Sequence, residues 1–165
     1  MGALTIRALR TVLAASLTGS VFVQVIMVPL VWNDLDGADQ DVLDVRAPVL
    51  LIVVLGVLTT QVVMVCVWRL LTMVRRGTVF SDAAFPPVDV MITAIACAAA
   101  LLAALGVILA PGDVVAPGAV LLIGGAATVT AGTALVVVVM RSLLRQAVAR
   151  EVEAGHLRAE LDEVI

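Results

Sequence analysis

The sequence has little charge, few aromatic side chains, no lysine, one histidine and two cysteines among its 165 residues. Charged residues make up 14% of the chain and hydrophobic residues 62%, a balance that excludes a soluble globular domain of this length. All ten basic residues are arginine and the formal net charge is -3. No large positive field indicates nucleic-acid binding, so we expect no direct nucleic-acid contact.

Side chains that bind metals or act as nucleophiles are equally scarce. Cys66 and Cys97 lie in apolar segments, without the paired spacing of a metal site or the density of a disulfide framework. His156 lies in a charged segment with no second ligand at helical spacing. The aspartate-rich segment 34–44 lacks the glutamate that ends a calcium-binding loop. We therefore predict no metal site, no cofactor and no enzymatic activity.

What the chain does contain is four apolar segments, at about residues 9–32, 47–68, 88–110 and 117–140. Each is long enough to cross a hydrocarbon core roughly 30 Å thick as a helix. None has a charge in its interior, where a charged side chain costs at least about 2.5 kcal/mol. They also lack the alternation of barrel strands. The sequence predicts an all-α membrane protein with a four-helix transmembrane domain, residues 1–140, and a tail, residues 141–165.

The arginines are distributed unevenly between the two sides of these segments. Those outside the first connection are Arg7, Arg10, Arg69, Arg75, Arg76, Arg141, Arg145, Arg150 and Arg158. Because cytoplasmic segments carry the excess of basic residues, we expect both termini and the central loop in the cytoplasm. The aspartate-rich connection, with Arg46, would face outward. Trp32 and Trp68 fall at span ends, where tryptophan prefers to lie.

Small residues at four-residue spacing predict how two of the helices pack, since they allow close backbone approach in lipid. The predicted contact stripes consist of Gly124, Thr128 and Gly132 in the fourth span and Ala96, Ala100 and Ala104 in the third, with Gly106 nearby. Gln24 and Gln61 are polar residues inside spans and could pair. Helical counting, however, places Gln61 roughly 9 Å deeper than Gln24 from the outer boundary, so pairing requires tilt.

The tail, residues 141–165, has the spacing of an amphipathic helix. Its apolar positions are Leu144, Val148 and Val152, followed by Leu157, Leu161 and Val164. Four arginines and five acidic residues give it a net charge of -1 before the terminal carboxylate. An acidic terminus avoids anionic lipid, which favours a protein partner for the apolar stripe.

The central loop concentrates charge and aromatic side chains in "VRRGTVFSDAAF". Arg75 and Arg76 are suited to anchor the end of the second helix at the level of lipid phosphates, and Phe80 to lie in the interface. The simplest interpretation is a turn that returns the chain to the membrane. The alternative is that Arg75, Arg76 and Phe80 contact a partner.

Three segments together carry a family resemblance: "VCVWRLLTMVRRGTVFSDAAFPPVDVMI", "VVVVMRSLLRQAV" and the terminal "LRAELDEVI". They resemble the bacterial "domain of unknown function 2975" family, and the similarity extends over the second to fourth spans and the tail, about two thirds of the chain. The resemblance implies a four-helix protein of the bacterial inner membrane with no established activity. It also implies that the neighbouring gene often encodes a small helix-turn-helix regulator.

These observations lead to two hypotheses about function. The first is an integral inner-membrane protein that acts as membrane anchor or sensor partner of a soluble helix-turn-helix regulator. Its candidate partner-binding residues are Arg75, Arg76, Phe80, Leu157, Leu161 and Val164. The alternative is a small four-helix transporter or channel subunit that acts as a homo-oligomer. A proton-coupled transporter usually needs an ionisable group inside the membrane, and no span interior supplies one.

Overall fold

The computed structural model describes residues 3–35, 40–76, 85–111 and 115–164, and its regular structure is all helical. The elements are α1 (Ala3–Phe22), the π-helical segment η1 (Val23–Met27), α2 (Val28–Asp34), α3 (Gln40–Arg76), α4 (Phe85–Leu109) and α5 (Pro117–Val164). Four stretches of the described residues are long and apolar enough to cross a membrane: Arg7–Asp34, Val45–Val74, Phe85–Leu109 and Pro117–Gly155. The predicted all-α fold, with four helices long and apolar enough to span a membrane, is confirmed.

Two helices extend beyond the predicted spans. α3 begins at Gln40, about seven residues before the predicted start, so Asp41 and Asp44 belong to its first turns rather than to a loop. The helix continues through Pro48. α5 runs without interruption from Pro117 to Val164, past the predicted boundary at residue 140. The fourth span and the tail therefore form one helix, about 72 Å long.

The first span is not a regular α-helix throughout, because η1 interrupts it just before Pro29. Proline lacks a backbone N–H and its ring crowds the carbonyl four residues earlier, here that of Val25. A π-helical turn at Val23–Met27 accommodates this conflict by widening the helix locally. The first span thereby remains one continuous helical path up to Asp34.

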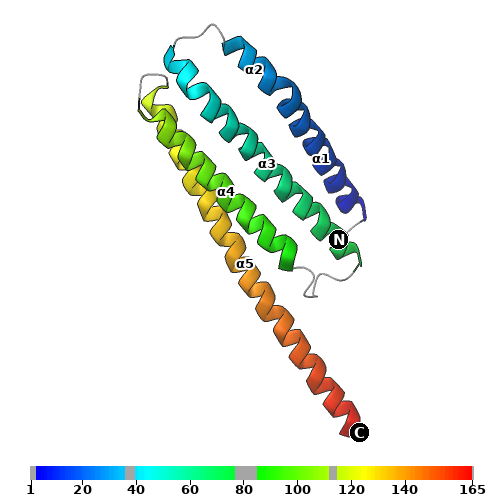
Figure 1. Cartoon of the computed structure of the whole chain (residues 1–165). Coiled ribbons are helices and arrows are strands. Elements are labelled where there is room, and N and C mark those ends of the chain that lie inside the picture. The colour runs from blue at the N-terminus through cyan, green and yellow to red at the C-terminus, as the bar shows by residue number, and fades with distance from the viewer. Residues whose placement is uncertain (1–2, 36–39, 77–84, 112–114, 165) are drawn as a thin grey trace.

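The four long helices lie side by side, with α3 between α1 and α4, and α4 between α3 and α5 (Figure 1). α4 packs closely against both of its neighbours, whereas α1 makes far fewer close backbone approaches to α3. α5 continues well beyond the other helices toward the C-terminus (Figure 1). The bundle is thus an open row in which α1 is peripheral and α5 projects.

Small side chains form the buried contacts between helices. The buried hydrophobic residues are Cys66, Val88, Ala94, Ala99, Ala127 and Ala134. Large hydrophobic side chains face outward instead, among them Leu121 and Val129, which are 77% and 71% exposed. Such exposure is expected where lipid replaces water, because lipid chains are as apolar as leucine.

α4 and α5 pack closely, as predicted, and Gly106 faces Ile123 of α5, but the two predicted contact stripes are wrong. The residues of both stripes are exposed: Ala96, Ala100, Ala104, Gly124, Thr128 and Gly132. α5 uses Ile123, Ala127, Thr130 and Ala134 instead, at alternating spacings of four and three. A stripe at constant spacing four rotates about 40° per step and leaves the contact line, whereas alternating steps stay on it.

Candidate functional site

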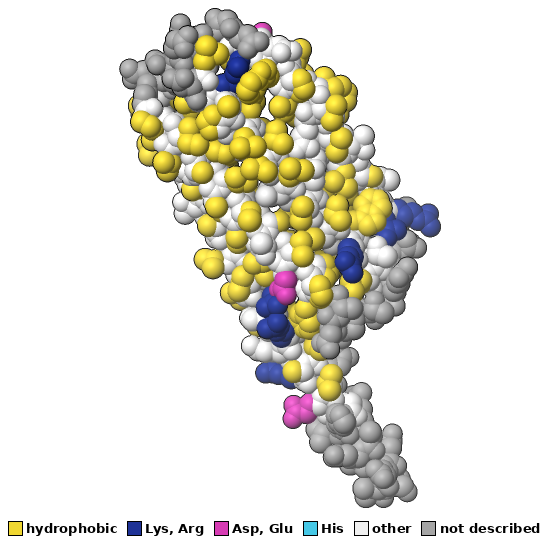
Figure 2. Space-filling model, in the orientation of Figure 1, with side chains coloured by type: hydrophobic (Ala, Val, Ile, Leu, Met, Phe, Trp, Pro, Cys, Tyr) yellow, Lys and Arg dark blue, Asp and Glu magenta, His cyan; other side chains and the backbone are white. Residues whose placement is uncertain are grey.

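Most of the described basic side chains gather at one end of the bundle, where α1 begins, α3 ends and α4 begins. Figure 2 shows most of the blue side chains around the point where α5 leaves the bundle, while hydrophobic side chains are spread over the described part of this face beyond them. We call this the arginine-rich end, and its described guanidinium groups belong to Arg7, Arg10, Arg69, Arg141, Arg145 and Arg150. Arg46 lies at the opposite end, where its guanidinium stacks 4.0 Å from the ring centre of Trp32.

An ion pair joins α4 to α5 at the arginine-rich end. Arg141 Nη2 donates a hydrogen bond of 2.6 Å to Asp89 Oδ2, and Arg141 Nε lies against Asp89 Oδ1. The contact combines one charge-assisted hydrogen bond with the close approach of a second guanidinium nitrogen to the carboxylate. One turn further along α5, the Arg145 guanidinium lies 5.5 Å from the ring centre of Phe85, which begins α4. Charge therefore fixes the start of α4 against α5.

A second arginine joins α1 to α3 at the same end. Arg10 Nη2 donates a hydrogen bond of 2.7 Å to Thr72 Oγ1, and its guanidinium lies 5.3 Å from the ring centre of Trp68. Thr72 Oγ1 itself donates to the Trp68 carbonyl oxygen at 2.9 Å, which orients the hydroxyl. Trp68 thus provides a cation–π surface for the first helix.

A polar network of Ser20, Gln24 and Gln61, which we call the glutamine network, joins α1 and η1 to α3 further along the span. Gln61 Nε2 donates to Gln24 Oε1 at 2.9 Å and to Ser20 Oγ at 3.0 Å. Gln24 Nε2 donates to the Val54 carbonyl oxygen at 3.1 Å. Helical Cα–Cβ bonds tilt toward the N-terminus, so in antiparallel helices these two side chains tilt toward each other. That tilt overcomes the depth difference expected from helical counting.

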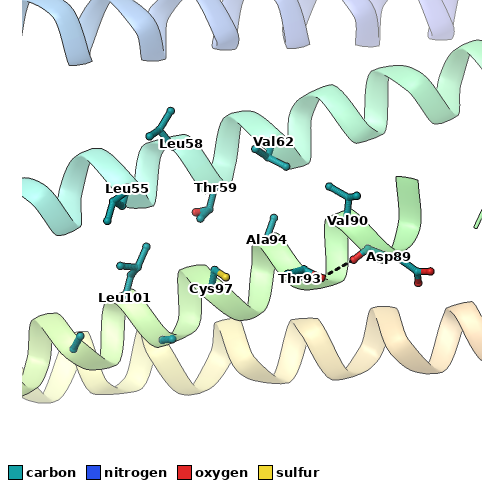
Figure 3. A pocket seen from close by; sticks show the side chains of 12 residues that line it. Leu55, Leu58, Thr59, Val62, Asp89, Val90, Thr93, Ala94, Cys97 and Leu101 are labelled. Carbon is teal, nitrogen blue, oxygen red and sulfur yellow. Dashed lines mark hydrogen bonds between the residues drawn. The ribbon is translucent and has the colours of Figure 1, made fainter. Parts of the chain in front are cut away.

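The α3–α4 groove consists of two adjoining cavities between those helices, of 880 and 380 Å³. Figure 3 shows the larger cavity, where Thr59 on α3 and Cys97 and Leu101 on α4 point toward one another. Its lining is almost entirely apolar. The carboxylate of Asp89 is turned away from the α3 side chains, as its bond to Arg141 on α5 requires (Figure 3).

The structure places only part of the predicted partner-binding set. The backbones of Arg75 and Arg76 end α3 at the arginine-rich end, and Phe80 lies outside the described residues. Positions 157, 161 and 164, which carry Leu157, Leu161 and Val164, lie on the distal part of α5. The helix that carries these three positions extends away from the bundle (Figure 1).

Sequence reasoning missed Asp89 and its partner Arg141. Asp89 is one residue inside the predicted third span, but α4 begins four residues before it, at Phe85. An acid near the start of one span and an arginine at the matching end of the next antiparallel span are a recognisable signal. Opposite charges at equal depth can pair across adjacent helices.

No group of three or more histidine, cysteine, aspartate or glutamate residues suited to a metal ion occurs in the described part of the chain. Both cysteines are free thiols, with Cys66 buried and Cys97 exposed. The residues of the arginine-rich end can bind anions, carboxylates or aromatic rings, as their observed contacts illustrate.

Comparison with known proteins supports the family resemblance. No curated protein and no solved structure has significant similarity to the chain. Residues 30–165, which include α3, α4 and α5, match the family described as "Protein of unknown function (DUF2975)". Because this match covers well over half of the sequence, the chain belongs to the DUF2975 family.

Proposed function

We propose that this protein is a multi-pass protein of the bacterial cytoplasmic membrane that binds a soluble partner through its arginine-rich end and the projecting part of α5. The proposed role is that of a non-enzymatic membrane anchor or sensor. A small helix-turn-helix regulator is the proposed partner, because the family resemblance implies that such a regulator is often encoded in the neighbouring gene.

The proposed orientation rests on the arginines. Contacts at the arginine-rich end unite the start of α1 with the end of α3, through Arg10 and Thr72, and the start of α4 with α5, through Asp89 and Arg141. A common excess of basic residues on these segments favours the cytoplasmic side. Arg46 and Trp32, at the opposite end, would then lie at the outer surface.

The observation that carries the proposal is the length of α5. At 48 residues it measures about 72 Å, more than twice the roughly 30 Å of a hydrocarbon core. A helix of this length, once it spans the bilayer, extends far into the aqueous phase. Its distal part is therefore accessible to a soluble protein.

The register of α5 gives this projection a distinct face. Leu144 and Val148 are half-buried and continue the face that packs on α4. Nine residues separate positions 148 and 157, which corresponds to about two and a half helical turns. Positions 157, 161 and 164 thus lie on the side of α5 opposite to the bundle. An apolar stripe there is suited to dock into the groove of a partner protein.

Co-purification tests this function. The tagged full-length protein, solubilised from its native membrane, should retain the regulator encoded beside it. Truncation after Arg150 should abolish retention while membrane insertion stays unchanged, and Gly125→Ala, on the membrane part of α5, is the matched control that should retain it. If no regulator is retained and reconstituted vesicles instead release a small solute, the transporter or channel alternative is correct.

A further inference from the structure

The α3–α4 groove combines a basic end with an apolar channel. Its two cavities share Leu58, Val62 and Val90, so they form one continuous depression along both helices. The smaller cavity reaches Arg69 at the arginine-rich end, and the larger one reaches Leu55 toward the other end. A molecule with a charged head and an apolar chain would match this polarity.

The groove is longer than the hydrocarbon part of one bilayer leaflet is thick. From Arg69 to Leu55 the helix rises through fourteen residues, or roughly 21 Å. Half of a hydrocarbon core roughly 30 Å thick is about 15 Å. A lipid whose headgroup lies at Arg69 can therefore place a whole acyl chain inside the groove.

The chain portion of the groove is apolar and open to the surrounding lipid. Leu58, Val62 and Val90 are 42%, 40% and 48% exposed, although they line the cavities. Ala100, a small residue on α4, leaves room between the larger side chains. Asp89, the acidic residue among the lining positions, has its carboxylate bound to Arg141 and turned away from α3 (Figure 3). No described charge therefore opposes an acyl chain there.

The head portion favours a negative charge. Arg69 is exposed at the small cavity, and no described acidic residue forms an ion pair with it. Pro86 and Pro87 line the same cavity, which places the N-terminal turn of α4 beside Arg69. The positive end of that helix dipole adds to the field of the guanidinium. Basic cavities between membrane helices on the cytoplasmic side bind anionic headgroups in other proteins.

We propose that the α3–α4 groove binds an anionic phospholipid, with the phosphate at Arg69 and one acyl chain along α3 and α4. This lipid binding and the proposed function both require that the four helices are inserted into a membrane. It does not depend on any soluble partner, so the co-purification experiment can fail while this proposal holds.

Native mass spectrometry of the full-length protein tests the headgroup contact. The protein is purified in a mild detergent and offered phosphatidylglycerol and phosphatidylcholine with identical acyl chains in equal amounts. We expect retention of phosphatidylglycerol to exceed that of phosphatidylcholine roughly fivefold. One arginine near anionic headgroups contributes about 1 kcal/mol of binding free energy, which corresponds to that ratio. Arg69→Gln should remove the preference, and Arg69→Lys should keep most of it. Arg7→Gln, an equal loss of charge at the same end, should leave the preference intact.

A second variant tests the position of the acyl chain independently of the headgroup. Ala100→Leu places a larger side chain in the groove at an exposed position and should reduce retention of both lipids severalfold. Equal retention of the two lipids by the unaltered protein, or equal effects of Arg69→Gln and Arg7→Gln, would overturn the proposal. Unchanged lipid retention in Ala100→Leu would exclude the groove as the site of the chain.

Discussion

The two outer helices of this row are attached in different ways. α5 packs closely on α4 through small side chains, with Ala127 and Ala134 each 8% exposed, and the Asp89–Arg141 ion pair reinforces the contact. The first span, made of α1, η1 and α2, is not buried in its apolar window. It nevertheless forms hydrogen bonds with α3 at the arginine-rich end, through Arg10, and at the glutamine network, through Ser20 of α1 and Gln24 of η1. In lipid, where burial of apolar surface gives little, helices associate by packing or by polar bonds. This protein uses the first for α5 and the second for α1.

The difference has a consequence for the proposed function. A helix fixed by close packing over much of its membrane span carries its projecting part in a defined direction. A helix held by a few polar side chains can be released by the loss of those bonds. We therefore expect α3, α4 and α5 to behave as one rigid unit, and α1 to separate from them first.

The largest effect should follow from a change in the packed contact between α4 and α5. Ala134→Leu adds three carbons to a buried position of α5 and should lower the free energy of unfolding by about 1–3 kcal/mol. The matched control is Gly132→Leu, two residues away, where an added Cβ has no neighbour within 4 Å. Unfolding in detergent micelles with increasing SDS measures both. If Gly132→Leu is the more damaging change, the helix face has been assigned wrongly.

Removal of the ion pair should have a somewhat smaller effect. Asp89→Ala leaves Arg141 partly buried without its carboxylate and should lower the free energy of unfolding by about 1–2 kcal/mol, since both side chains keep some contact with solvent. The same SDS titration measures it. Exchange of the two residues, Asp89→Arg with Arg141→Asp, should recover part of the loss. Two results together would mean that the ion pair contributes no specific stability: the exchanged pair recovers none of the lost free energy, and Arg150→Ala lowers the free energy of unfolding as much as Asp89→Ala does.

The smallest effect on stability should come from the loss of the glutamine network. The accompanying local change in structure should be confined to α1. Gln61→Leu removes both hydrogen bonds that Gln61 donates. At an average of about 0.6 kcal/mol for each such bond, it should lower the free energy of unfolding by roughly 1 kcal/mol. Backbone hydrogen exchange should increase in α1 and stay constant in α4 and α5. Thr60→Val is the control, because the Thr60 hydroxyl bonds only to the Gly56 carbonyl of its own helix. Equal exchange in all four helices would contradict the proposed polar attachment.

The sequence predicted the positions of the spans but not the faces through which they pack. Length and hydropathy identified four spans, because the membrane imposes both on any crossing helix. They did not identify which face of α5 meets α4, since Gly124, Thr128 and Gly132 satisfy the small-residue pattern as well as Ala127 and Ala134 do. The two faces of α5 differ only in which of them α4 covers, and this depends on how the helices are arranged in space.

The candidate site was less predictable from the sequence than the spans were. The pairing of Gln24 with Gln61 depends on side-chain tilt, which residue counting along the axis omits. α4 begins at Phe85, three residues before the predicted start of the third span. This shift moves Asp89 from the edge of the predicted span to the second turn of the helix, and hydropathy alone does not fix the start of a helix that closely. The α3–α4 groove is formed jointly by two helices, so no single segment of the sequence specifies it.

The measurement that tests the account most directly is the side of the membrane on which the projecting part of α5 lies. In a variant with Cys66→Ala and Cys97→Ala, single cysteines are introduced at Gly155, on α5, and at Asp39, in the connection between α2 and α3. A thiol reagent that cannot cross membranes should label the cysteine at Asp39 in intact cells, and the one at Gly155 only after the cells are permeabilised. Labelling of Gly155→Cys in intact cells would place the arginine-rich end outside and contradict the proposed cytoplasmic partner.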